Sequence, residues 1–358
     1  MARIGLSAKE ACMVALYVTS MGDGVGNGAL CAGLGRRLMA DGRKVGFLKP
    51  VCASPEGVTR DAGIMKQVLD LDDPVESLCG TSGSAADMAA TADEKEPPWL
   101  KEINAAFSRV SRGKDVVLLE GLGDVKAESD SARVAGRVVD ALKARAILLV
   151  GGGADVDPDQ VVAAAKMLGD GLLGVVINAV PERKMESIRT RMAPALEQNG
   201  VRVLGVLPEE RTMYAVTVGE LAEHVGGSIL NSQDRAGELV ENVMVGAMSP
   251  DSALSYLTLK ANKAVITRGD RPDIQLAALE TSTKCLVLTG GTDPSHGILS
   301  RALELEVPIV LVDGDTVSTM EAVEGVFEKA APYSDKKLER LDSMLQRYLD
   351  LEAVRHAC

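Results

Sequence analysis

The stretch Cys12–Met39, CMVALYVTSMGDGVGNGALCAGLGRRLM, decides the fold of this chain. Its apolar run from Cys12 to Thr19 predicts a buried β-strand, and the pattern that follows the glycines predicts a helix. Between the two lies a turn with glycine at every second position: Gly22, Gly24, Gly26 and Gly28. Such a turn lets the backbone approach a ligand closely, and the helix behind it presents free N–H groups at the positive end of its dipole. The stretch therefore predicts a strand–loop–helix unit with a candidate anion site.

This loop departs from the phosphate-binding pattern GxxxxGK[ST] at both positions that carry side-chain chemistry. With Gly26 aligned on the last glycine, Asn27 stands where the lysine belongs and Gly28 where the hydroxyl belongs. The lysine contacts the phosphates and the hydroxyl binds magnesium. Losing one or two charge-assisted hydrogen bonds of about 1.5–3 kcal/mol each weakens binding by roughly one to four powers of ten. The candidate nucleotide- or anion-binding residues of the loop are Gly22, Asp23, Gly24, Val25, Gly26, Asn27 and Gly28.

Three interpretations of the loop remain open at this point. It is a working ATP loop in which Lys44 or Lys49 replaces the missing lysine, a dinucleotide-binding turn, or a strand-to-helix corner without a ligand. The segment 24–29 matches GxGxxA, but the dinucleotide interpretation requires an acidic residue at the end of the second strand, which ends in Lys49-Pro50. For catalysis we favour a corner or a degraded anion-binding loop, and weak binding of a nucleotide stays open.

Composition excludes several classes of protein. The 358 residues are 25% charged and 46% hydrophobic, as in ordinary soluble globular proteins. A net charge of −12 argues against nucleic-acid or anionic-membrane partners, which require basic patches. No apolar run approaches the roughly 20 residues of a membrane-spanning helix. The N-terminus lacks a small-residue cleavage site, so we expect mature sequence.

The six cysteines show no metal-binding spacing, and the three histidines are far apart. Cys12, Cys31 and Cys285 lie in apolar patterns, so we expect them in the core. A reducing cytoplasm is the compartment consistent with this usage. On motif grounds we do not expect a cysteine or histidine metal site.

Buried strands alternate with helices over the first 210 residues, which predicts a parallel sheet covered on both faces. After the first strand we expect strands at Lys44–Val51, Asp115–Leu119, Ala146–Val150, Leu172–Asn178 and Val203–Leu207, and a polar connection over Gly80–Pro98. Ligands bind at the carboxyl ends of such strands. The loops predicted to converge there are Ser20–Gly28, Lys49–Pro50, Glu120–Asp124, Gly151–Asp157 and Asn178–Pro181.

A smaller α/β domain is expected after a boundary near Pro208–Tyr214. The predicted division is 1–210, 211–331 and a C-terminal amphipathic helix in 332–358. Strands are expected in the second domain at Glu241–Val245, Ala264–Thr267, Lys284–Thr289 and Pro308–Val312. In the tail an apolar seam of Leu338, Leu341, Leu345 and Tyr348 predicts one helix. We favour its packing on its own domain or a sister subunit over a dedicated partner-binding role.

The ordered segments VTSMGDGVGNG, GFLKPV, Asp61, LLEGLGD, GVVINAVP and LGVLPE resemble the dethiobiotin synthetase and cobyrinic acid diamide synthase family of P-loop proteins. The resemblance implies a P-loop NTPase-like domain in which Lys49 lies near the phosphates and Asn178 contacts adenine. It also implies that Asp61 and Glu120 hold Mg²⁺ when a nucleotide binds. Because Asn27 and Gly28 depart from the family, the implied ligand is weakly bound ATP with Mg²⁺.

The second half resembles the DRTGG domain, which is akin to nucleotide-sensing regulatory modules. The resemblance rests on TVGELAEHVGGSIL, ENVMVGAMSPDSALSYL, VITRGDRPDIQLAALETSTKCLVLTGG and EVPIVLV. It implies self-association and a ligand at Asp270, Arg271, Gly290 and Gly291. The two parts together resemble the regulatory N-terminal region of long phosphate acetyltransferases, whose catalytic domain follows. The chain ends at Cys358, so we do not expect it to carry acetyl transfer.

The sequence therefore predicts a cytoplasmic, non-catalytic or weakly catalytic ligand-sensing protein that forms a homo-oligomer. Its expected partner is a separately encoded phosphate acetyltransferase or another metabolic enzyme, with no nucleic acid and no membrane. The first alternative is an ATP- and Mg²⁺-dependent carboxylate-activating synthetase. The second is a structural oligomerisation scaffold.

Overall fold

The computed structural model describes residues 13–22, 24–52, 55–153, 156–328 and 334–357, without the side chains of 55–61 and 328. The chain divides into two compact units, Met1–Glu209 with Asp335–Cys358, and Glu210–Ser334. Among the described residues, no helix is both long enough and apolar enough to cross a membrane.

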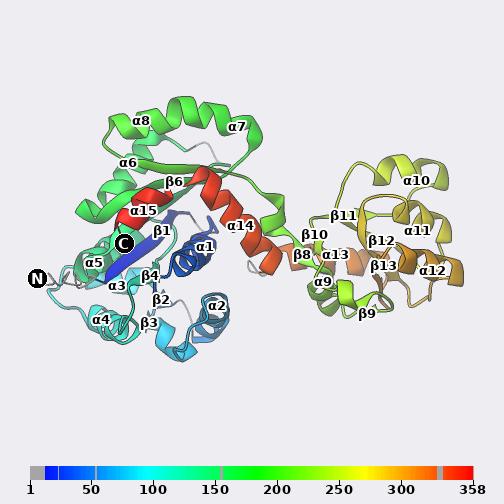
Figure 1. Ribbon diagram of the computed structural model, residues 1–358, viewed down its shortest axis with the longest axis horizontal. Helices are drawn as coiled ribbons and strands as arrows, with labels where there is room; N and C mark the ends of the chain where they lie inside the picture. The colour runs from blue at the N-terminus through cyan, green and yellow to red at the C-terminus, as the bar shows by residue number, and fades with distance from the viewer. Residues whose placement is uncertain (1–12, 23, 53–54, 154–155, 329–333, 358) are drawn as a thin grey trace, which may run out of the picture. The chain divides into compact units, whose positions relative to one another are not determined.

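The first unit is built on a seven-stranded sheet in the order β3-β2-β4-β1-β5-β6-β7 (Figure 1). All its paired strands run parallel. The strands are β1 Val14–Met21, β2 Val45–Cys52, β3 Cys79–Ser82, β4 Val116–Glu120, β5 Arg145–Gly151, β6 Leu172–Val180 and β7 Val203–Pro208. The central residues of β1, β2, β4, β5 and β6 are buried on both faces, which explains the continuous apolar runs in the sequence. The predicted parallel α/β fold is confirmed.

Helices cover both faces of this sheet. They are α1 Asn27–Ala40, α2 Pro55–Val68, α3 Ala85–Ala90, α4 Pro98–Val110, α5 Asp130–Leu142, α6 Pro158–Lys166, α7 Glu182–Ser187 and α8 Ala193–Gln198. The connections through α1 and α2 run toward the β3 edge of the sheet, whereas those through α4, α5 and α6 run toward the β7 edge. Because all crossovers are right-handed, α1 and α2 lie on one face and α4, α5 and α6 on the other. The carboxyl ends of β1, β2, β4, β5 and β6 therefore share one edge of the sheet.

The edge strand β3 and the helix α3 lie where the sequence predicted only a polar connection. The four residues of β3 have no apolar run, because an edge strand is covered on fewer sides than a central one. Its pairing with β2 depends on Gly80. A Cβ at that position would lie 2.4 Å from the carbonyl oxygen of Pro50, so a side chain there would separate the two strands.

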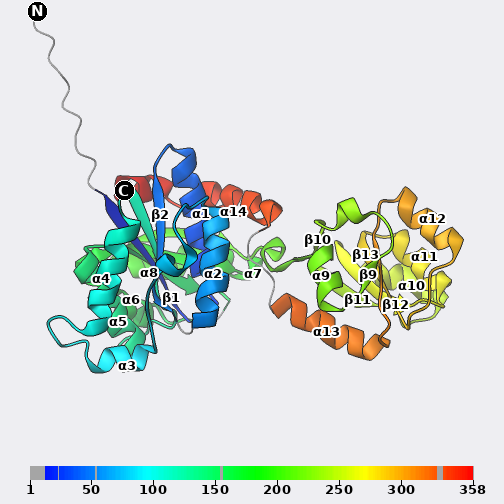
Figure 2. The same cartoon turned by 90° about the horizontal axis from the view of Figure 1, so that it is seen from below.

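The C-terminal tail forms two helices, α14 Asp335–Tyr348 and α15 Leu351–Ala357, so the prediction of one helix was wrong. The break occurs because Leu349 bridges Gly205 of β7 and the N–H of Asp350 donates to the carbonyl of Leu204 at 2.7 Å. The helix α14 lies beside α1, as Figures 1 and 2 both show. The tail thus belongs to the first unit.

Asp350 makes the attachment of the tail dependent on pH. Its carboxylate accepts hydrogen bonds from the N–H of Ala353 and from Arg202, and these bonds lower its pKa. Because the pKa in the folded state is below the unfolded value of about 3.9, the stabilisation is present above that value and is lost as the pH falls through the lowered pKa.

We expect the free energy of unfolding of the native chain to decrease more steeply below about pH 4 than that of Asp350→Asn. Urea titrations across pH 3–7 check this. Asp72→Asn is the control, an aspartate for which no described ion pair exists, and it should follow the native curve. Equal slopes for the native chain and Asp350→Asn would contradict the expectation.

The second unit has a five-stranded sheet in the order β11-β12-β13-β14-β9, in which β9 is antiparallel and the other pairs are parallel. A two-stranded pair, β8 and β10, completes it. The strands are β8 Val216–Thr217, β9 Ser228–Ile229, β10 Leu239–Val240, β11 Asn242–Val245, β12 Lys263–Arg268, β13 Thr283–Thr289 and β14 Ile309–Leu311. The helices are α9 Val218–His224, α10 Pro250–Leu257, α11 Pro272–Leu279, α12 His296–Glu304 and α13 Thr316–Glu328.

Two hydrophobic clusters occupy the two faces of this second sheet. Alternate residues of β12 show the division, since Ala264 and Ile266 join the cluster with α9 and α13, and Val265 joins the cluster with α11 and α12. The strands β11 to β14 agree with the predicted ones. The sequence did not predict β8, β9 and β10, because two-residue strands carry no periodic pattern.

Candidate functional site

The glycine loop joins the carboxyl end of β1 to the first turn of α1. Gly22, Gly24 and Gly26 all have positive φ, from 69° to 109°, where a side chain would be strained. Gly26 occupies the N-cap of α1, and no side chain caps the helix there. The loop therefore keeps the geometry of an anion-binding turn, and none of the described side chains accepts a hydrogen bond from the first N–H groups of α1.

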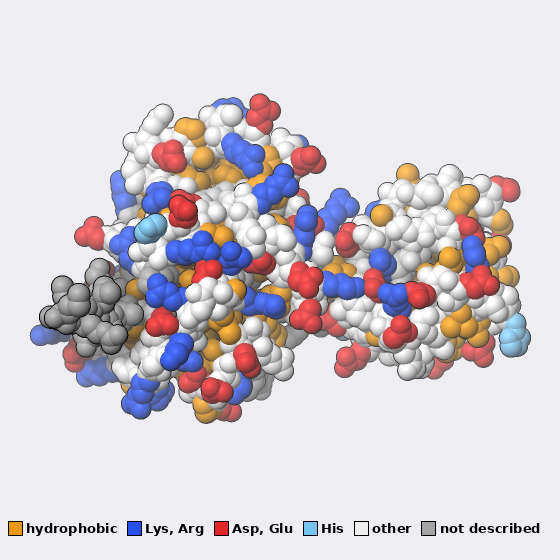
Figure 3. Space-filling model, in the orientation of Figure 1, with side chains coloured by type: hydrophobic (Ala, Val, Ile, Leu, Met, Phe, Trp, Pro, Cys, Tyr) orange, Lys and Arg blue, Asp and Glu red, His pale blue; other side chains and the backbone are white. Residues whose placement is uncertain are grey.

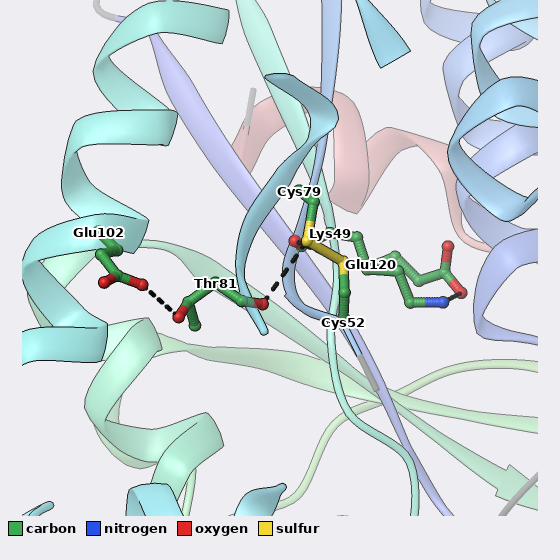
Figure 4. Close-up of a disulfide and its surroundings, with 6 residues drawn as sticks. All are labelled: Lys49, Cys52, Cys79, Thr81, Glu102 and Glu120. Carbon is green, nitrogen blue, oxygen red and sulfur yellow. Dashed lines mark hydrogen bonds and ion pairs between the residues drawn. A yellow bond between two sulfur atoms is a disulfide. The ribbon is translucent and has the colours of Figure 1, made fainter. Parts of the chain in front are cut away.

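Lys49 of β2 and Glu120 of β4 form an ion pair beside this loop, with Nζ 3.6 Å from a carboxylate oxygen (Figure 4). The pairing follows from the sheet, because β2 and β4 are neighbours with Leu48 opposite Leu119. Both side chains are largely buried, at 21% and 14% exposure. The ammonium group thus neutralises the carboxylate that the family resemblance assigned to Mg²⁺.

Two asparagines fasten the loop to the sheet. Asn27 donates from Nδ2 to the carbonyl of Gly121 at 3.4 Å, and its buried Oδ1 has no hydrogen-bond partner among the described residues. Asn178 donates from Nδ2 to the carbonyl of Val25 at 2.8 Å. The side chain that the resemblance assigned to adenine therefore holds the glycine loop in this structure.

The contacts just described join four of the five loops that were predicted to converge, all except Gly151–Asp157. Val25 meets Asn178, Asn27 meets Gly121, and Lys49 meets Glu120. Asp23 lies outside the described residues. Asp61 lies in α2, but its side chain also lies outside what the structure describes, so its relation to Glu120 stays a prediction.

Gly121 permits close packing directly after Glu120. Tyr17 of β1 is 1% exposed, and a Cβ on Gly121 would lie 2.3 Å from its ring carbon Cζ. Burial raises the pKa of Tyr17 far above its usual value, so its hydroxyl stays protonated. The sequence motif EG marks this glycine, but only the packing shows that it accommodates a tyrosine ring.

In the second unit, the turns after β12 and β13 are in contact. The N–H of Gly269 donates to the carbonyl of Thr289 at 3.1 Å, and a Cβ on Gly269 would lie 2.1 Å from the carbonyl oxygen of Thr292. The predicted ligand residues Asp270, Arg271, Gly290 and Gly291 belong to these two turns. The structure thus places the predicted residues on adjacent strand ends.

The groups of these predicted ligand residues already have partners within the protein. Asp270 binds Arg268, and Arg271 binds Asp273 with a distance of 2.8 Å. The second bond lowers the pKa of Asp273. The N–H groups of Gly290 and Gly291 donate to the carbonyls of Gly314 and Val312. A ligand that needs these groups must displace internal bonds.

A pocket beside Arg271 was not predicted from the sequence. Arg271 donates to the carbonyl of Met248 at 3.0 Å, and Met248 lines a hollow of about 580 Å³ between β11 and α10. The lining residues are Val245, Ala247, Met248, Ser252, Ser255, Tyr256 and Leu259. Its walls are mostly apolar.

Comparison with protein families identifies both units. Residues 14–217, more than half of the chain, match the family described as AAA domain. The chain belongs to the AAA domain family. Residues 220–326 match the DRTGG domain. The AAA domain match covers the seven-stranded sheet with the glycine loop, and the DRTGG match covers most of the second unit.

Over most of its length the AAA–DRTGG chain is similar to proteins named phosphate acetyltransferase. That of Nitratidesulfovibrio vulgaris is 24% identical over 94% of this chain and 50% of the relative. That of Pseudomonas putida is 26% identical over 97% of this chain and 52% of the relative. The chain thus spans about half the length of these curated relatives. The architecture expected from the sequence motifs is confirmed.

Two solved structures show weaker similarity. The CBS and DRTGG domains of the regulatory region of Clostridium perfringens pyrophosphatase, complexed with diadenosine tetraphosphate, match 38% of this chain and 62% of that one, at 18% identity and a TM-score of 0.29. The signal recognition particle receptor FtsY of Elizabethkingia anophelis, in complex with GDP, matches 59% and 61%, at 13% identity and a TM-score of 0.33. Scores this low support no inference about ligands.

Proposed function

We propose that this protein is a sensor of a nucleotide or another phosphorylated metabolite, with weak or no catalytic activity, of the kind found in the N-terminal region of phosphate acetyltransferases. The ion pair between Lys49 and Glu120 is the observation that carries the proposal. It neutralises Glu120, the carboxylate that a magnesium ion requires, and it holds Lys49 where an incoming anion can compete with Glu120 for the ammonium group.

The composition of the glycine loop supports the same proposal. An ATP-using P-loop supplies a lysine for the phosphates and a hydroxyl for Mg²⁺. Here Asn27 is uncharged and Gly28 has no side chain. Lys49 is the cation beside the loop, and it exchanges Glu120 for an incoming phosphate at the cost of the existing ion pair. Weak binding that depends little on magnesium follows from this exchange.

Self-association through the DRTGG domain is part of the proposal. Helices α10, α11 and α12 carry exposed leucines, Leu254, Leu276 and Leu303, each about half exposed. The face drawn in Figure 3 shows hydrophobic side chains interspersed with acidic and basic ones on this unit. We propose a homo-oligomer in the cytoplasm that acts on a phosphate acetyltransferase or another metabolic enzyme.

ATP titration by calorimetry, with and without Mg²⁺, tests this function. We expect weak binding of ATP, with an affinity that changes by less than about threefold with the metal. In Lys49→Met we expect the affinity to fall by about tenfold or more, which corresponds to the free energy of one charge-assisted hydrogen bond. Lys44→Met is the matched control, because Lys44 directly precedes β2 at the opposite end of the strand. It should bind as the native chain does.

Two other outcomes would replace the proposal. Tight, magnesium-dependent binding with ATP turnover that disappears in Glu120→Ala supports the synthetase alternative. A thermal-shift screen of nucleotides and phosphorylated metabolites in which none raises the melting temperature supports the scaffold alternative, since a ligand at about 100 times its dissociation constant adds roughly 2.7 kcal/mol.

A further inference from the structure

A disulfide lies directly beside the ion pair. Cys52, the last residue of β2, is bonded to Cys79, the first residue of β3, with a Cα–Cα distance of 6.4 Å. Figure 4 shows it between the Lys49–Glu120 pair and the hydrogen bond from Thr81 to Glu102. The two cysteines are 27 residues apart and match no motif, so the sequence does not predict their pairing.

The surroundings of the two sulfur atoms suit a dithiol as well as a disulfide. The Sγ of Cys52 lies 3.8 Å from the carbonyl oxygen of Lys49, and the Sγ of Cys79 lies 3.5 Å from the carbonyl oxygen of Thr81. After reduction each S–H group therefore has an acceptor within reach. The reduced form can satisfy both S–H groups once the two sulfur atoms have moved apart to a non-bonded distance.

The Cys52–Cys79 pair has one member in contact with solvent, whereas both described free cysteines are buried. Cys52 is buried, but Cys79 is partly exposed and lies on an edge strand. Cys31 and Cys285 are fully buried, and burial raises the pKa of Cys31 well above its usual value and that of Cys285 to about 12. Cys79 is thus the more exposed residue of the pair, and we take its sulfur as the one that reacts first.

The disulfide is also close to Lys49 in the sheet. Lys49 and Cys52 belong to the same strand, and Lys49 stands opposite Cys79 in the pairing of β2 with β3. The strand β3 has only four residues and pairs with β2 alone, so the disulfide adds a covalent link to a short strand pairing. Opening the bond removes a covalent restraint on the end of β2 next to Lys49.

We propose that Cys52 and Cys79 form a redox-active dithiol–disulfide pair that controls how firmly Lys49 is held against Glu120. The proposal builds on the ligand site proposed above and assigns it a form of regulation. Disulfides in reducing compartments are usually transient and redox-sensing, which agrees with the expected cytoplasmic location.

The chemistry is thiol–disulfide exchange with a small-molecule disulfide as the oxidant. The thiolate of Cys79 attacks one sulfur of the oxidant and releases one thiolate, which leaves a mixed disulfide on Cys79. The thiolate of Cys52 then attacks the Sγ of Cys79 and releases the second thiolate. Two electrons pass from the protein sulfurs to the oxidant, and the two protons of the cysteine thiols go to the released thiolates.

The first test equilibrates the full chain in buffers of varied glutathione to glutathione disulfide ratio, and traps free thiols by alkylation for peptide mass spectrometry. We expect Cys52 and Cys79 to convert together and reversibly within this range. A pair that stays reduced in every buffer, or a disulfide that excess dithiothreitol does not reduce in the folded protein, would overturn the proposal.

The second test compares amide hydrogen exchange in the oxidised and reduced forms. We expect exchange in 45–52 and 79–82 to be faster by about tenfold after reduction, because the edge strand β3 and the strand β2 paired with it lose a covalent restraint and open more often. The variants Cys52→Ser and Cys79→Ser should exchange like the reduced form in any buffer. Cys285→Ser is the control that should keep the native redox response.

Exchange rates in 45–52 that do not change on reduction would overturn the link to Lys49. ATP affinity of the two forms is measured in parallel, with an expected difference of at least threefold that both serine variants abolish. An equal affinity in the two forms also counts against the proposal. If neither form binds ATP, inorganic phosphate or other phosphorylated metabolites, the proposed ligand site fails, and the exchange rates still decide the redox inference.

Discussion

The variant Leu345→Ala is expected to lose about 2–5 kcal/mol of the free energy of unfolding of the first unit, the usual cost of a cavity at a buried leucine. Leu345 is 0% exposed in α14 and packs against α1. The contact is tight, because a Cβ on Gly33 would lie 2.6 Å from a methyl group of Leu345. Truncating the leucine removes the centre of the tail's attachment, and the rest of α14 has little room to refill it.

Trp99 provides the measurement. It is the single tryptophan of the chain, lies in α4 and is 7% exposed, so its fluorescence during urea unfolding reports the first unit. Leu303→Ala is the matched control, since Leu303 is 52% exposed in the second unit and should leave this transition within about 0.5 kcal/mol of the native one. An equally small loss in Leu345→Ala would show that the tail does not dock on α1.

The second large effect is expected for Gly121→Ala, which should destabilise the first unit by about 1–3 kcal/mol, the range for an overpacked core. The added methyl group would lie 2.3 Å from the ring of Tyr17, which has no space to move because β1 is central in the sheet. Either the ring or the end of β4 must shift. Because Glu120 precedes Gly121, a shift of β4 also disturbs the ion pair with Lys49.

A double-mutant cycle isolates this contact. Tyr17→Leu alone should cost stability by leaving a cavity, but in combination with Gly121→Ala the penalty of the alanine should largely disappear, as measured by Trp99 fluorescence in urea. Gly63→Ala is the control, because no atom that the structure describes lies within 4 Å of its added Cβ and alanine is favoured in a helix. A Gly121→Ala variant as stable as the native chain would contradict the packing described here.

Much of the fold follows from local sequence patterns. The strands β1, β4, β5 and β6 were predicted because each is a continuous apolar run, which a strand buried on both faces requires. The glycine loop and α1 were predicted because positive φ favours glycine and the helical pattern follows at once. With β2, whose strand was also predicted, these elements and the carboxyl-end rule brought Lys49, Glu120 and Asn178 to one edge.

The sequence by itself therefore determined the two α/β units, the parallel sheet and the edge where the candidate site lies. Tertiary structure alone decided which groups pair there: Lys49 with Glu120, Asn178 with Val25, and Cys52 with Cys79. It also decided the edge strand β3 and the division of the tail at Leu349. The reason is that periodicity and propensity act over a few neighbouring residues, whereas these contacts join residues brought together by the packing of separate strands and helices.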